Sequence, residues 1–187
     1  LLQYAAPRLA LSGRANSTLK VALEHNQLKS ADIELAIRGL RRSGLSSASI
    51  PVDVRVSGAL DSEKARLALD ANVGDAQVGL VRLRIPPAAG AAAPLIDRIA
   101  EAPIKGRIRW NGPAETLWAL AAQEGHDLAG PIALRADIGG VVGDPDVSGR
   151  FRARGARYEN LNLGAKVTDF TMRGNFTGPT IKIEQAQ

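Results

Sequence analysis

The stretch Val147-Ser-Gly-Arg-Phe-Arg-Ala-Arg154 sets arginines at every second position from Arg150, with small or apolar residues between them. Successive side chains of a β-strand point to opposite sides, so this spacing gives one charged face and one smooth face. A helix would scatter the same residues around its circumference. The stretch therefore predicts a strand with one side in water and the other side away from it.

The same alternation recurs along the 187-residue chain, and it predicts further strands within 19–24, 33–38, 52–57, 65–70, 104–110, 132–138, 170–176 and 181–184. Gly74-Asp75, Gly143-Asp144-Pro145 and Gly178-Pro179 separate several of these segments. Such residues favour tight turns, which join antiparallel strands rather than parallel ones. The fold class expected from the pattern is mainly β, a long antiparallel meander.

Two segments break the pattern, at 86–103 and 111–130. In the second, Pro113 is tolerated as a first helical residue, Glu115 suits the first turn, and Gly125 is a stop signal. This predicts one short helix near 113–124, with an apolar side that lies on the sheet and comprises Leu117, Leu120 and Ala121. We take residues 1–187 as one continuous section of an elongated, repetitive β structure with these two non-strand or helical insertions.

Glycines stand inside several predicted strands, in phase with the apolar residues. Gly58, Gly106 and Gly149 show this arrangement and hint at a loose repeat. Glycine normally weakens a strand interior, so its recurrence on the apolar side needs a cause. We expect the sheet to bend, or another backbone to approach closely, where these side chains are missing. After Arg154, the sequence Gly155-Ala-Arg157 predicts a bulge or a strand end.

Composition limits the interior and the chemistry. Hydrophobic residues make up 45% of the chain but aromatic residues only 4%, which favours a thin or open interior lined by Val, Ile, Leu and Ala. The chain has no cysteine, which excludes disulfides and thiolate metal sites. It begins at Leu1 without a leader-like or membrane-spanning segment, so we expect an internal piece of a longer protein.

The C-terminal half resembles a known family. The segment Gly143–Gly164, followed by Val167-Thr-Asp-Phe and Arg173-Gly-Asn-Phe-Thr-Gly, is similar to the repeated strands of the TamB family. The insertion Gly112-Pro-Ala-Glu-Thr-Leu-Trp-Ala-Leu-Ala, with Leu128-Ala-Gly-Pro-Ile after it, fits the same family. The likeness covers about residues 104 to 187, whereas residues 1 to 103 share only the strand pattern.

The resemblance implies a fold and a role. TamB is the inner-membrane subunit of the translocation and assembly module of Gram-negative bacteria and is related to the AsmA-like proteins. Such proteins are anchored in the inner membrane, cross the periplasm as a sheet folded lengthwise like a taco, and cooperate with an Omp85-family outer-membrane barrel. The resemblance thus implies a periplasmic segment whose apolar groove serves phospholipid transport between the membranes, outer-membrane protein assembly, or both.

Acyl chains need a continuous apolar strip shielded from water. The residues expected to line it, and to contact phospholipid acyl chains, are Val52, Val54, Val56, Leu67, Leu69, Val78, Leu80, Ile104, Ile108, Ile132, Leu134, Ile138, Val147, Phe151, Phe170, Met172, Phe176, Ile181 and Ile183. The same residues also suit the closed core of a β-sandwich or barrel. That alternative is a structural or adhesive module without lipid cargo.

Catalytic signals are weak. His25 and His126 are the only histidines, and neither belongs to a metal-binding spacing such as H-E-x-x-H. Gly143-Asp-Pro-Asp146 lacks the alternating oxygen ligands of a calcium loop and is better explained as a β-turn. The sequence has no GxGxxG or GxxxxGK[ST] motif for nucleotides. We therefore expect no enzyme activity, no cofactor and no metal site.

The balance of 24 Lys and Arg against 19 Asp and Glu gives a formal charge of +5. Paired or alternating arginines could meet phosphates of lipid, lipopolysaccharide or nucleic acid. The arginines considered for this are Arg41, Arg42, Arg82, Arg84, Arg107, Arg109, Arg150, Arg152, Arg154 and Arg157. Single-strand binders interleave such charges with stacking aromatics, which this chain does not do. The pattern favours a solvated outer face, leaves contact with anionic lipid or a partner open, and predicts no nucleic-acid partner.

Overall fold

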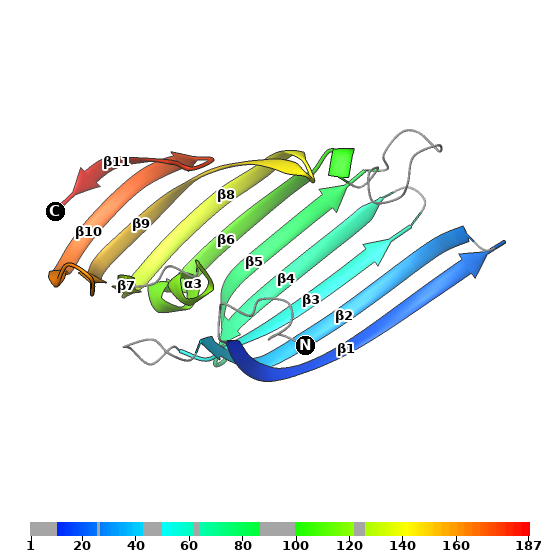
Figure 1. Cartoon of the computed structure of the whole chain (residues 1–187), viewed down its shortest axis with the longest axis horizontal. Helices are drawn as coiled ribbons and strands as arrows, with labels where there is room; N and C mark the ends of the chain where they lie inside the picture. The colour runs from blue at the N-terminus through cyan, green and yellow to red at the C-terminus, as the bar shows by residue number, and fades with distance from the viewer. Residues whose placement is uncertain (1–10, 26, 43–49, 62–63, 87–99, 122–125) are drawn as a thin grey trace.

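A computed structural model describes residues 11–25, 27–42, 50–61, 64–86, 100–121 and 126–187. Their strands form one 11-stranded antiparallel sheet in the order β1-β2-β3-β4-β5-β6-β8-β9-β10-β11, with β7 paired to β9 (Figure 1). Each strand of this path lies beside its neighbours in the chain apart from the small excursion of β7. The predicted meander is confirmed, and because β1 and β11 end the path at opposite edges, the sheet is not the closed sandwich or barrel of the alternative.

The elements have the following bounds: β1 Leu11–Glu24, β2 Gln27–Arg42, β3 Val52–Leu60, β4 Ala65–Val73, β5 Ala76–Ile85, β6 Lys105–Pro113, α3 Ala114–Ala121, β7 His126–Ala129, β8 Pro131–Val141, β9 Asp144–Asn160, β10 Ala165–Thr177 and β11 Thr180–Ala186.

Tight turns join strands where the sequence predicts them. Gly74 (φ 57°) and Gly178 (φ 53°) adopt left-handed backbone conformations in the turns after β4 and β10. Glycine has no Cβ to clash in that region, which is why it is found there. A third turn, at 142–143, separates β8 from β9. The turn predicted for Gly143-Asp-Pro-Asp146 is therefore confirmed only at Gly143, because Asp144, Pro145 and Asp146 already belong to β9.

The predicted helix is present as α3, directly after Pro113, which is the last residue of β6. Two hydrogen bonds tie the start of the helix to the residue before β8: the Ala114 amide donates to the Gly130 carbonyl (2.7 Å), and the Gly130 amide donates to Glu115 Oε1 (3.1 Å). The insertion expected at 111–130 thus also contains the end of β6 and all of β7. Gly125 and the side chains of Leu120 and Ala121, like residues 87–99 of the first insertion, lie outside what the structure describes.

The core is small and lies between the sheet and α3. Val52, Ala71, Val78 and Trp110 are buried together, and Leu117 of the helix packs against them. The helix contacts β2 as well as β7, so it crosses the sheet at the end where β2 finishes (Figure 1). As predicted, the helix covers apolar strand surface through Leu117.

The predicted irregularity after Arg154 is a paired distortion of two strands. In β9, Ala153 and Ala156 face Met172 and Phe170 of β10, so β9 accommodates one additional residue between them. Gly155 has φ 55°, and Asp169 across from it has φ 56°. A β-bulge of this kind increases local twist and lets Ala153 and Ala156 both be buried.

Candidate functional site

Cross-strand register gathers the apolar residues of the strands on one side of the sheet. Trp110 faces Leu134, and Leu134 faces Phe151, on three adjacent strands. Directly opposed residues of antiparallel strands project to the same side, so a row of such pairs marks one face. Continuing the row in both directions defines the apolar face, which reaches from Ile37 on β2 to Ile183 on β11.

Most of the residues expected to line a groove lie on this apolar face. By register and alternation they are Val52, Val54, Val56, Leu67, Leu69, Ile108, Ile132, Leu134, Ile138, Val147, Phe151, Phe170, Met172, Phe176, Ile181 and Ile183. Val78 belongs to the core cluster on the same side. Ile104 precedes β6, is buried, and donates its amide to the Gly140 carbonyl (3.0 Å).

Leu80 is the exception and requires a correction. It faces Asp70 on one side and Arg109 on the other, which places it on the opposite, charged face. The cause is a bulge in β5: Ala71 faces Gly79 while Asn72 faces Gln77, so Val78 is an additional residue in the ladder. The alternation restarts after this bulge, and Val81 and Leu83 take the apolar positions instead.

The apolar face is also larger than the sequence prediction. Ile33 on β2 faces Gly58, and Leu19 on β1 faces Ile33, so the face continues along β2 and onto the edge strand β1. The alternation in 19–24 and 33–38 is the sequence signal for these positions. The further apolar-face residues missed by the sequence reasoning are Val21, Leu35, Ile37, Val81, Leu83 and Trp110.

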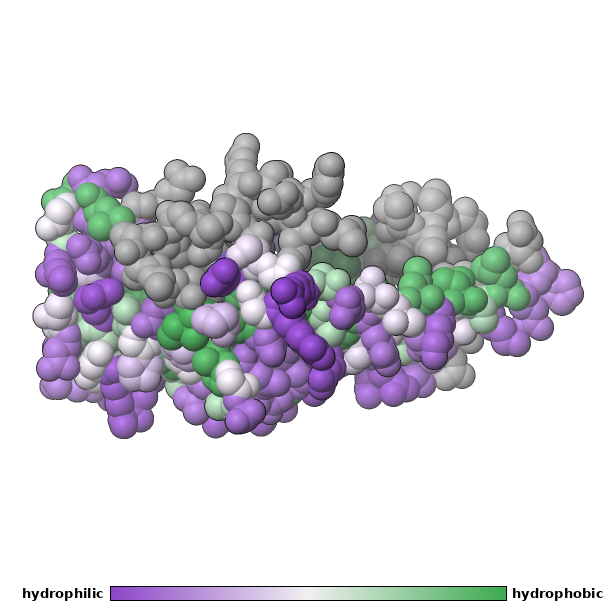
Figure 2. All heavy atoms as spheres, turned by 90° about the horizontal axis from the view of Figure 1, so that it is seen from below, coloured by the Kyte–Doolittle hydropathy of each residue, from purple (hydrophilic) through white to green (hydrophobic). Residues whose placement is uncertain are grey.

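Coverage of the apolar face is uneven. Trp110, in the core cluster against which α3 packs, is only 7% exposed. In contrast, Leu19 on β1 is 65% exposed and Ile181 on β11 is 66% exposed. Figure 2 shows hydrophilic residues along one side of the sheet and a hydrophobic strip on the other side near the β1 edge. Among the described residues, the helix α3 covers only the core end, so large apolar side chains at both edges remain in contact with water.

The glycines on the apolar face lie under large side chains of neighbouring strands. A Cβ placed on Gly79 would lie 2.8 Å from the Trp110 ring, and one on Gly149 would lie 2.7 Å from the Phe176 ring. The backbone of Arg135 and Ala136 also lies close to Gly149. The close approach expected at this glycine therefore involves both backbone and the Phe176 side chain. At these two positions the missing Cβ leaves the space that the neighbouring ring occupies.

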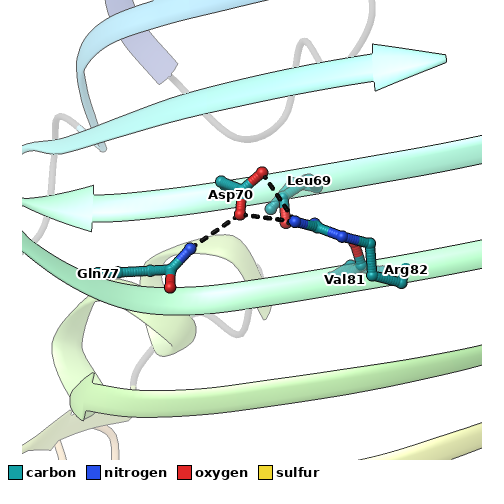
Figure 3. A network of polar contacts seen from close by, with 5 residues as sticks. All are labelled: Leu69, Asp70, Gln77, Val81 and Arg82. Atoms are coloured by element: carbon teal, nitrogen blue, oxygen red, sulfur yellow. Dashed lines mark hydrogen bonds and ion pairs between the residues drawn. The ribbon is translucent and has the colours of Figure 1, made fainter.

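The opposite side, which we call the charged face, holds ion pairs between neighbouring strands. Asp70 accepts hydrogen bonds from Gln77 Nε2 (2.8 Å) and from Arg82 (3.1 and 3.3 Å), while the other terminal nitrogen of Arg82 donates to the Leu69 and Val81 carbonyls (Figure 3). Such groups keep this side of the sheet hydrated and hold β4 against β5.

The residues considered for catalysis are not assembled into a site. His25 lies in the turn after β1, and His126 begins β7 with its Nδ1 2.6 Å from the Tyr158 hydroxyl. Within the described ranges, no group of three or more His, Cys, Asp or Glu side chains is placed to hold a metal ion. No described helix combines the length and apolar character needed to cross a bilayer.

Comparison with known proteins gives no match: no protein-family model, no curated protein and no solved structure matches this chain.

Proposed function

We propose that the apolar face binds phospholipid acyl chains and that the chain is a section of a TamB-like lipid conduit. The observation that supports this most is the continuous apolar face from β1 to β11, with exposed large side chains at both edges. Soluble proteins rarely leave such surfaces uncovered unless they serve as binding sites.

The physical chemistry of the face suits an acyl chain. Its residues are aliphatic or aromatic, with no charged group among the directly opposed positions from Val54 through Leu134 to Ile183. Each buried methylene of a bound chain contributes about 0.8 kcal/mol, so affinity grows with the length that contacts the face. No polar pocket is required, because the headgroup stays in water beyond the edge.

The wider setting is part of the same proposal. The TamB-like strand repeats in residues 104–187 support a place in the periplasm, as part of a parent protein anchored in the inner membrane. They also support cooperation with an Omp85-family barrel and participation in outer-membrane protein assembly. The competing proposal, a structural or adhesive module with a closed dry core, is weakened because the sheet is open.

Native mass spectrometry of the protein purified from a membrane-containing host tests this function. The wild-type chain should carry phospholipid, and Ile33→Asp should lose most of it because a carboxylate then interrupts the apolar face. Ile33 is 41% exposed, so this substitution spares the core. Leu163→Asp is the matched control: Leu163 is 79% exposed in the turn after β9, and its replacement should leave the lipid in place.

Lipid-free wild-type protein that unfolds cooperatively as a monomer would contradict the proposal. Equal loss of lipid from Ile33→Asp and Leu163→Asp would also contradict it, because the apolar face would then not be the site.

A further inference from the structure

A row of arginines crosses three adjacent strands on the charged face. Arg109 on β6 faces Arg135 on β8, and Arg135 faces Arg150 on β9. Neighbouring strands lie about 4.8 Å apart, so three guanidinium groups start from adjacent positions on the same side of the sheet. We call these residues the arginine row.

The arginine row is not neutralised by the protein. Nearby arginines on the charged face do have acidic partners: Arg82 pairs with Asp70 (3.1 Å) and Arg107 pairs with Asp137 (3.2 Å). Among the described residues, no carboxylate lies within ion-pair distance of any member of the row. Like charges directly opposite one another weaken strand pairing, so the arginine row lowers the stability of the pairing of β6 with β8 and of β8 with β9.

A hollow of about 490 Å³ lies over the row and contains further hydrogen-bonding groups. Besides the row, its lining includes Arg107, Asp137, Ser148 and Asn175. Asp137 is engaged by Arg107, and the Asn175 amide donates to Glu184 Oε1 (2.7 Å). The three guanidiniums and the Ser148 hydroxyl therefore remain as donors to a ligand in the hollow.

A second hollow of about 580 Å³ also lies on the charged face, lined by Lys20, Arg66, Arg82, Arg84 and Lys105 together with Asp32 and Glu34. The lining of each hollow has a formal net charge of +3. The second hollow also has a row of directly opposed cations, Arg66, Arg84 and Lys105, but only two of these are arginines. The arginine row is distinguished by its three opposed guanidinium groups.

We propose that the arginine row binds the phosphate group of an anionic ligand. Planar guanidinium forks match the oxygen geometry of phosphate and bind it through paired, charge-assisted hydrogen bonds. Adjacent arginines would share one phosphate, which removes the repulsion along the row. A lipid headgroup and a soluble phosphate compound share this chemistry. The site is on the side away from the apolar face, so it does not depend on the proposed function.

Two probes separate these sources. Isothermal titration calorimetry with pyrophosphate tests a soluble phosphate compound. Flotation with vesicles of phosphatidylcholine, with and without phosphatidylglycerol, tests an anionic headgroup. Arg135→Gln removes the central member of the row and should weaken binding of whichever probe the site takes by about tenfold. Arg55→Gln is the control, because it removes the same charge from an exposed position on β3 of the same face.

Pyrophosphate binding that depends on Arg135 would support a soluble ligand. Flotation that requires phosphatidylglycerol and depends on Arg135 would support a lipid headgroup. The proposal is overturned if neither probe binds, or if Arg135→Gln and Arg55→Gln weaken binding equally. Because lipid retention on the apolar face is measured with Ile33→Asp, failure of one proposal is distinguishable from failure of the other.

Discussion

The ring of Trp110 on β6 lies directly over Gly79 on β5, and the two residues face each other in the ladder. A Cβ on Gly79 would lie 2.8 Å from two ring carbons and 3.0 Å from the Ala71 Cβ. Real Cβ atoms do not approach other atoms so closely, so the indole occupies space that only glycine leaves free. Because Trp110 belongs to the core cluster, this contact holds β5 against β6 in the core beneath α3.

Gly79→Ala should therefore destabilise the fold by about 1–3 kcal/mol, because the added methyl forces Trp110 out of its place in the core. Urea unfolding, followed by circular dichroism, measures the change. Gly139→Ala is the control, since a Cβ at Gly139 meets nothing within 4 Å and its φ is not in the left-handed region. Equal loss of stability in both variants would show that the close contact is not what requires glycine at position 79.

The bulge opposite β10 gives a second prediction. Gly155 has φ 55°, and a Cβ there would make only an ordinary 3.5 Å contact with Asp169 Oδ1. Strain rather than lack of space is the cost, so Gly155→Ala should lower the free energy of unfolding by about 1–2 kcal/mol. Gly155→Asn should lose less, because asparagine tolerates this conformation better. An alanine variant as stable as wild type would show that the bulge relaxes without glycine.

The Asp70 network on the charged face predicts a salt-dependent contribution. The Asp70 side chain is 27% exposed and that of Arg82 is 48% exposed. We therefore expect Asp70→Asn to lower the free energy of unfolding by about 0.5–1 kcal/mol. The Arg107–Asp137 pair is far more exposed, and Asp137→Asn should cost less. The difference between these variants in thermal unfolding should shrink as salt is raised. A difference that persists in concentrated salt would assign the effect to the hydrogen bond from Gln77 instead.

The strands were predictable because one side of the sheet is apolar and the other wet, a pattern of period two that does not depend on pairing partners. The error at Leu80 has a local cause. The bulge at Val78 reverses the alternation for the rest of β5, and a single residue such as Val78 carries no sequence sign of being unpaired. The register between the strands could not be predicted from the sequence either. Arg109, Arg135 and Arg150 could be read as outward-facing, but not as directly opposed, since that depends on turn lengths and bulges.

Leu19 on the edge strand β1 and Ile33 on β2 belong to the apolar face, although the expected groove residues do not include them. Only the pairing of β1 with β2, and of β2 with β3, shows that their side chains continue the same face. The glycines were noticed for their phase, yet the rings that lie over Gly79 and Gly149 come from other strands. No local pattern predicts those partners.

Photocrosslinking in cells tests most directly whether lipid contacts the apolar face. A photoreactive phenylalanine analogue at Ile33 reports on that face, and the same analogue at Glu34 reports on the charged face one residue away. Both positions are exposed, so both variants should fold. We predict phospholipid adducts by mass spectrometry at position 33 and few or none at position 34. Adducts at neither position, or equally at both, would contradict the account.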